Sequence, residues 1–297
     1  MQNLVPRLPL ELEREIFELS AWHDKPTMLV LILVASRVRV WIEPLLHRVI
    51  RIRTREQFKA LHERLTNNAT YCASVCHVLF TGASWPELYH ALEYILRECT
   101  NLVDLGIWVG DAWKTPPAAA AAGCAAGERQ EPRNFLEVAS PRLSRLSLML
   151  EDLTGVPGAL IFAPDLRCFT SVTHLDLVDF NPQPPAILAL LKRPVLPSLA
   201  CLAIADADIE LCRAILALPR PLRILCIYGE LVPEHIEATI PDPRFCVVYA
   251  ADSQYSQAIG STLRGANAGL WELAERRVET RRRNAVEAAS ASGRMPV

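Results

Sequence analysis

The chain has no long apolar run, no closely spaced cysteine pair and no excess of either charge. Its longest unbroken apolar stretch, Met28–Ala35, is far shorter than the roughly 20 residues that a membrane-spanning helix needs. The 31 basic and 33 acidic side chains leave a net charge of −2, which gives no general attraction to nucleic acid or to acidic membranes. Glu11, Glu13 and Glu15 interrupt the beginning of the chain, which is therefore unlike a secretory signal. We expect a protein of the cytoplasm or nucleus that contacts no membrane.

The nine cysteines are scattered along the chain and include no C-x-x-C pair. An odd number without a secretory segment predicts reduced thiols. Cys201 and Cys226 lie inside apolar runs, where a thiol packs as a small hydrophobic group. The nearest approach to a metal cluster is Cys72-x-x-x-Cys76-His77, and no second ligand pair follows at zinc-site spacing. We therefore expect no metal and no cofactor, and interpret these thiols as packing groups.

An internal repeat is the clearest pattern in the chain. Five segments carry apolar residues at positions i, i+3 and i+5, and the last two of each triple point to one face of a strand. The triples are Leu102/Leu105/Ile107, Leu143/Leu146/Leu148, Val172/Leu175/Leu177, Leu199/Leu202/Ile204 and Leu222/Leu225/Ile227. Their middle residues follow one another at intervals of 41, 29, 27 and 23 residues. Three of these intervals fall within the roughly 20–29 residues typical of leucine-rich repeats.

The long first interval has a visible cause. Residues 115–133 form an insertion rich in alanine, proline and glycine, and Pro116 and Pro117 would block a helix. We expect a mobile surface loop there, and an alanine-rich helix is the alternative.

Further strand-like segments extend the repeat in both directions, at 49–52, 75–80 and 245–249, with amphipathic segments between the strands. Alternation of strand and helix at this period predicts parallel strands joined by right-handed crossovers. The predicted fold class is α/β: an irregular leucine-rich-repeat-like right-handed solenoid with a parallel sheet of about seven or eight strands. The Asn that closes each turn in that family is replaced here by Gly110, Glu151, Phe180, Ala207 and Glu230.

The first fifty residues have a different pattern, which predicts three short helices. Leu12, Ile16 and Leu19 mark one face of the first helix. The second, Met28–Ala35, is apolar on all sides and is expected to be buried. The third, Arg37–Glu43, is expected to stop before Pro44.

These residues also carry a family resemblance. Leu8-Pro9-x-Glu11-Leu12-x-x-Glu15-Ile16-Phe17, then Leu33-Val34-Ala35-Ser36-Arg37, then Pro44-Leu45-Leu46 resemble the F-box over residues 4–48. An aromatic residue often follows the last leucine pair in that family, and here His47 stands in its place. Together with the repeats, the chain resembles the fungal F-box/leucine-rich-repeat proteins.

The resemblance implies a partner and a function. F-box proteins dock onto the Skp-type adaptor of a cullin-type ubiquitin ligase and act as substrate receptors without catalysis. The expected adaptor-binding residues are Pro9, Leu12, Ile16, Val34 and Leu45. The alternative is a scaffold in which the same helices only cap the solenoid, because a solenoid needs a polar end for solubility.

We therefore expect three parts. An F-box-like helical head spans residues 1–48, the solenoid spans residues 49–252, and a C-terminal helix with a frayed basic end spans residues 253–297. In the last part, Leu270, Trp271, Ala274 and Val278 form a stripe that would dock on the solenoid. A helix that binds a partner is the alternative for this segment.

A basic stretch from Arg37 to Arg64 contains eight basic and three acidic residues. It lacks the interleaved aromatic residues suited to base stacking, so we interpret its arginines as the solvated side of an edge strand. Nucleic acid is not an expected partner.

No enzyme motif accompanies these features: the chain has no G-x-S-x-G, no phosphate-binding glycine loop and no H-E-x-x-H. His174 and Asp176 share one side of a strand, where an exposed polar face explains them. We expect a non-enzymatic protein whose unknown protein target would contact the residues that flank the strand leucines. These residues are Trp108, Met149, Asp176 and Tyr228.

Overall fold

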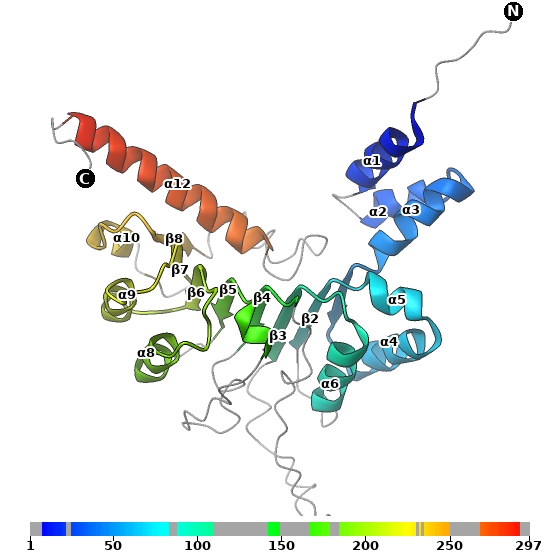
Figure 1. The fold of residues 1–297 in the computed structure, drawn as a ribbon, viewed down its shortest axis with the longest axis horizontal. Coiled ribbons are helices and arrows are strands. Elements are labelled where there is room, and N and C mark those ends of the chain that lie inside the picture. The colour runs from blue at the N-terminus through cyan, green and yellow to red at the C-terminus, as the bar shows by residue number, and fades with distance from the viewer. Residues whose placement is uncertain are drawn as a thin grey trace, which may run out of the picture.

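The computed structural model describes residues 8–21, 25–82, 88–109, 142–148, 167–178, 184–229, 232, 235–249 and 268–291. Its described strands form one eight-stranded sheet in which each strand pairs in parallel with the next along the chain (Figure 1). The strands are β1 (Val49–Ile52), β2 (His77–Gly82), β3 (Asp104–Val109), β4 (Arg145–Leu148), β5 (His174–Leu177), β6 (Cys201–Ala205), β7 (Ile224–Gly229) and β8 (Phe245–Tyr249). The predicted α/β class with a parallel sheet is confirmed. The insertion at 115–133 lies outside the described residues.

Helices lie at both ends of the sheet and on both of its faces. Three precede it: α1 (Leu10–Ala21), α2 (Lys25–Leu31) and α3 (Ser36–Leu46). Those between strands are α4 (Arg55–Asn67), α5 (Ala69–Ser74), α6 (Leu88–Glu98), α8 (Pro184–Lys192), α9 (Ile209–Leu216) and α10 (Ile236–Thr239). The last is α12 (Ala268–Ala291). Thr54, Asn68 and Asp208 begin α4, α5 and α9 by accepting a hydrogen bond from the backbone N–H three residues on.

The core face of the sheet carries the repeating leucines. Leu105, Leu146, Leu175, Leu202 and Leu225 are successive register partners across β3 to β7, and each is at most 2% exposed. They form one apolar cluster with buried residues of α4, α6, α8, α9 and α10. The period in the sequence therefore corresponds to one row of side chains across the sheet, which the helices cover.

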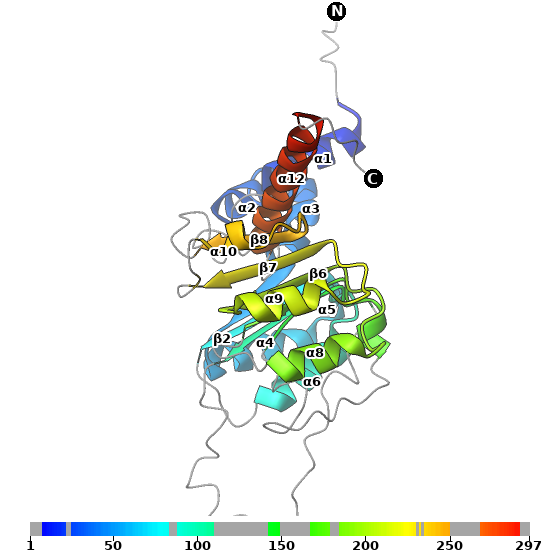
Figure 2. The same cartoon turned by 90° about the vertical axis from the view of Figure 1, so that its left-hand side faces the viewer.

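The second face of the sheet carries the alternate side chains, including Ser147, Asp176, Ala203, Cys226 and Cys246. Helix α12 lies on this face and contacts β7 and β8 (Figures 1 and 2). Its buried side chains are Leu270, Trp271, Leu273, Ala274 and Val278. The predicted docking stripe of the last helix is confirmed.

The head, defined here as α1 to α3, has a small core of its own made of Ala21, Met28, Val38 and Ile42. Two expectations about its helices are wrong. Helix α2 ends at Leu31 and buries only Met28, because a helix this short in a three-helix unit has one face against its neighbours. Helix α3 continues through Pro44 to Leu46, because a proline in the last turn removes only one backbone hydrogen bond.

In the described part of the chain, none of the helices has the length and hydropathy that crossing a bilayer requires.

Candidate functional site

Exposed apolar side chains gather on the head. Among the described residues, ten of the eleven large apolar side chains that are classed as exposed lie between Leu8 and Val40. The ten are Leu8, Leu10, Leu12, Ile16, Leu19, Leu29, Val30, Leu33, Val34 and Val40. Such a concentration marks a surface that contacts another protein more often than a surface that faces water alone.

Three of the five predicted adaptor-binding residues belong to this surface, and a fourth, Pro9, is exposed beside it. Pro9 is exposed, and the exposed fractions of Leu12, Ile16 and Val34 are 47%, 50% and 57%. Leu45 differs, because it is half-buried and packs against the head's own core. The head therefore presents the first four side chains outward and uses the fifth internally.

Helix α1 has two apolar faces, which explains why its leucines remain exposed. Phe17 and Ala21 turn towards the core of the head, and the Arg37 guanidinium of α3 donates to Glu13 Oε1 at 2.5 Å. These contacts fix the inner face, so the stripe of Leu12, Ile16 and Leu19 is left outside. The spacing of the residues in the sequence predicted this stripe. It did not predict the exposure of Leu29 and Val30, because the apolar run Met28–Ala35 was expected to be buried.

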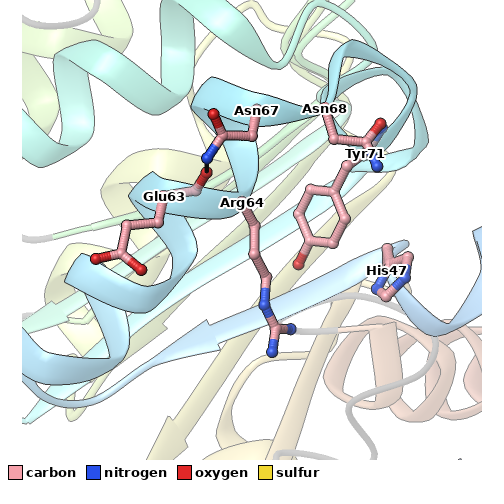
Figure 3. A pocket seen from close by; sticks show the side chains of 6 residues that line it. All are labelled: His47, Glu63, Arg64, Asn67, Asn68 and Tyr71. Atoms are coloured by element: carbon pink, nitrogen blue, oxygen red, sulfur yellow. Dashed lines mark hydrogen bonds between the residues drawn. The ribbon is translucent and has the colours of Figure 1, made fainter.

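A pocket of about 540 Å³ lies where the end of α3 meets α4 and α5 (Figure 3). His47 follows α3 directly, and its ring lies 4.4 Å from the ring of Tyr71, centroid to centroid. Arg64 and Asn68 also line the pocket. Burial lowers the pKa of His47 and raises the pKa of Tyr71. His47 thus links the end of α3 to α5 through its contact with Tyr71.

The residues predicted to contact a target form a hydrogen-bonded network on the second face. Trp108 Nε1 donates to Ser147 Oγ at 2.5 Å, and Ser147 Oγ donates to Asp176 Oδ2 at 2.6 Å. The Tyr228 hydroxyl donates to Asp176 Oδ1 at 2.7 Å. The small side chain of Ala203, which lies between Asp176 and β7 in the register, leaves room for the tyrosine to reach across β6.

This network removes two predicted target residues from the surface. Asp176 is 1% exposed and Tyr228 is 7% exposed, while Trp108 is half-buried. Met149 lies outside the described residues. The expectation that Asp176 belongs to an exposed polar face is wrong, because two hydroxyl groups satisfy its carboxylate and allow its burial.

Two histidines lie one row earlier on the same face. His77 Nδ1 is 3.4 Å from Asp104 Oδ2, and both residues are buried. His174 Nδ1 is 2.8 Å from Thr173 Oγ1. Since that hydroxyl donates to Ser144 O, we assign the proton of this pair to His174 Nδ1. Burial lowers the pKa of His174 to about 4, so its ring is neutral at ordinary pH.

The cysteine and histidine residues of the candidate metal cluster make separate contacts. Cys72 Sγ donates to Leu65 O and Cys76 Sγ donates to Ser74 O, while His77 faces Asp104. Within the described ranges, no group of three or more His, Cys, Asp or Glu residues is arranged to hold a metal ion. Seven cysteines are free thiols: Cys72, Cys76, Cys99, Cys201, Cys212, Cys226 and Cys246.

Comparison with known proteins adds no relative: no protein-family model matches the chain, and no curated protein matches it significantly. Function must therefore be argued from the residues and their geometry.

Proposed function

We propose that the chain is a non-catalytic recognition protein, a substrate receptor of a cullin-type ubiquitin ligase. Its F-box-like head docks the Skp-type adaptor, and its leucine-rich-repeat-like solenoid presents a surface to a protein target. The receptor performs no chemistry on the target. It raises the effective concentration of the target near the ubiquitin-charged partner.

The observation that carries this proposal is the exposed apolar surface of the head. The head has its own core in Met28, Val38 and Ile42, so it does not need Leu12, Ile16 or Val34 to complete its packing. Fully burying one such side chain stabilises a complex by roughly 1.5–3 kcal/mol before the costs of association. A partner that covers several of them would therefore gain substantial binding energy.

The second candidate function is a scaffold whose head only caps the solenoid. The contact between α3 and α5 and the tilted ring contact of His47 with Tyr71 favour it. A head that served only as a cap would, however, turn the apolar stripe of α1 towards the repeats. The exposure of the stripe on α1 argues for docking of a partner in addition to any capping.

Co-purification tests the proposal. The full chain and a Skp-type adaptor are expressed together, and the complex is isolated on a tag carried by the chain. Val34→Asp places a charge in the docking surface and should reduce the retained adaptor at least about tenfold, because the charge would be buried without a partner. The double variant Leu12→Asp with Ile16→Asp should abolish retention.

The chain offers a matched control in Val286→Asp. Val286 on α12 is 55% exposed, against 57% for Val34, so both variants place the same charge at the same exposure. Val286→Asp should retain the adaptor like the original chain. If the original chain folds normally by circular dichroism and retains no adaptor, the ligase proposal is wrong and the scaffold remains.

A further inference from the structure

A groove with a volume of about 540 Å³ lies between α12 and the start of β7. Its walls are mainly charged. They include Arg223, Arg276, Arg282 and Arg283, with Glu275 and Glu279 beside them. Four guanidinium groups and two carboxylates make the groove a local positive surface on a chain whose net charge is −2.

The arginines of α12 divide into two groups by their contacts. Arg277 and Arg281 face α10, where both lie within ion-pair distance of Glu237, at 3.7 and 3.4 Å. Arg281 also donates to Ile240 O at 2.6 Å. These two residues hold α12 in place, and the one carboxylate that they share offsets part of their charge.

The groove arginines have no such neutralisation. Among the described residues, none of the four lies within ion-pair distance of a carboxylate. Arg276 Nε donates to Glu272 O and Arg282 Nη2 donates to Arg223 O, at 3.2 and 3.0 Å. Backbone carbonyls thus position two of the guanidinium groups without cancelling their charge, while Arg223 and Arg283 are exposed. An anion between them would relieve their mutual repulsion.

We propose that this groove binds an acidic segment of a partner protein, with carboxylates of the segment meeting the four arginines. Glu275 and Glu279 favour a polypeptide over nucleic acid, because they would repel a continuous phosphate backbone but can pair with a basic residue of a peptide. The inference adds the chemistry of a target to the proposed function. It is independent of adaptor docking, because α12 and the head lie at opposite ends of the sheet (Figure 1).

Peptide binding to the purified full chain tests this inference. The probes are a fluorescein-labelled peptide of alternating Glu and Ser and a matched peptide of Gln and Ser, compared by fluorescence anisotropy at low salt. The Glu peptide should bind at least about tenfold more tightly than the Gln peptide. Arg223→Ser with Arg283→Ser should weaken Glu-peptide binding about tenfold, since both side chains are exposed and can be removed without disturbing the fold.

The control variant is Arg14→Ser with Arg53→Ser, which removes the same charge from exposed positions outside the groove. It should bind the Glu peptide within about twofold of the original chain. Equal loss in the two variants, or no preference for Glu over Gln, would overturn the inference. So would tighter binding of an oligothymidylate of equal charge, which would make the groove a nucleic-acid site.

Discussion

The two halves of the second face of the sheet bury their side chains in different ways. Over β2 to β5 most of the buried residues are polar, as in Asp104 and Asp176, and they form hydrogen bonds across neighbouring strands. Over β6 to β8 they are mainly apolar, as in Ala203 and Cys226, and α12 packs on them, while Tyr228 of β7 donates a hydrogen bond to Asp176 of the polar half. One sheet with one topology thus uses internal polar pairing in one half and a docked helix in the other.

This difference bears on where binding surfaces can lie. A buried carboxylate with two hydroxyl donors, such as Asp176, stabilises the fold and offers nothing to a target. The apolar residues of β6 to β8 are covered by α12, so they are not accessible to a target either. The two surfaces that we propose for partners, the apolar outside of the head and the basic groove beside α12, both lie at the margins of the sheet. Three predictions test or sharpen this comparison, in order of decreasing effect.

The largest effect should come from removing the anchor of the apolar half. Trp271→Ala deletes a side chain that is 3% exposed between α12 and the sheet, and the cavity should lower the free energy of unfolding by about 3–5 kcal/mol. Urea denaturation followed by circular dichroism measures it. Val286→Ala, on the exposed side of the same helix, should change the value by less than about 0.5 kcal/mol. A loss below about 1 kcal/mol for Trp271→Ala would show that α12 contributes little to the fold.

The repeating leucines made the parallel sheet predictable. What covers the second face of the sheet could not be predicted in the same way. The middle leucines of the triples became register partners because each repeat, whatever its length, returns the same position of its strand to the same height in the sheet. Asp176 and Tyr228 are 52 residues apart in the chain, and their hydrogen bond reaches across β6, which separates β5 from β7 in the sheet. A strand pattern of alternating residues does not show what covers either face, so Asp176 was assigned to the surface.

The head shows a second limit of sequence reasoning. An apolar run such as Leu29–Val34 has the same composition whether it faces a core or a partner. The sequence therefore predicted a buried helix, and the structure exposes Leu29, Val30 and Leu33, along with Val34, which was expected to contact the adaptor. On α1, the spacing of Leu12, Ile16 and Leu19 did identify a stripe, because the helix also carries Phe17 and Ala21 for its inner face. Only on α1, which has a second apolar face, could residues that contact a partner be told from residues that pack in the core.

The polar half should respond to loss of its central acceptor. Asp176→Ala leaves the hydroxyls of Ser147 and Tyr228 buried without their acceptor, so the free energy of unfolding should fall by about 2–4 kcal/mol. Tyr228→Phe removes one donor and should cost about 1–2 kcal/mol. Combining the two changes should give less than their sum, because they break the same bond. Urea denaturation measures all three variants.

The exposed Glu210→Ala on α9 is the control, and it should change the free energy of unfolding by less than about 0.5 kcal/mol. An additive double variant would mean that Asp176 and Tyr228 do not act as a pair. The polar half would then be held by its apolar neighbours, as the other half is.

The smallest effect should be a pH dependence at the boundary between the halves, where His174 meets Trp271 at 4.9 Å, edge to face. Burial lowers the pKa of His174 from 6.5 to about 4, with Arg145 and Arg223 adding to the shift and Asp104 opposing it. Between these two pH values the unfolded chain binds a proton that the folded chain does not, so stability should be lost as the pH falls from 6.5 to 4. Because the ring is partly exposed, we expect the free energy of unfolding to fall by about 2 kcal/mol, measured by urea denaturation at pH 7 and pH 4.5.

His174→Gln should reduce this loss, and His235→Gln, at an exposed histidine, should not. Trp271→Ala should also reduce it, since opening the helix to solvent removes the burial that shifts the pKa. An unchanged pH dependence in both His174→Gln and Trp271→Ala would mean that α12 does not seal this edge of the polar half.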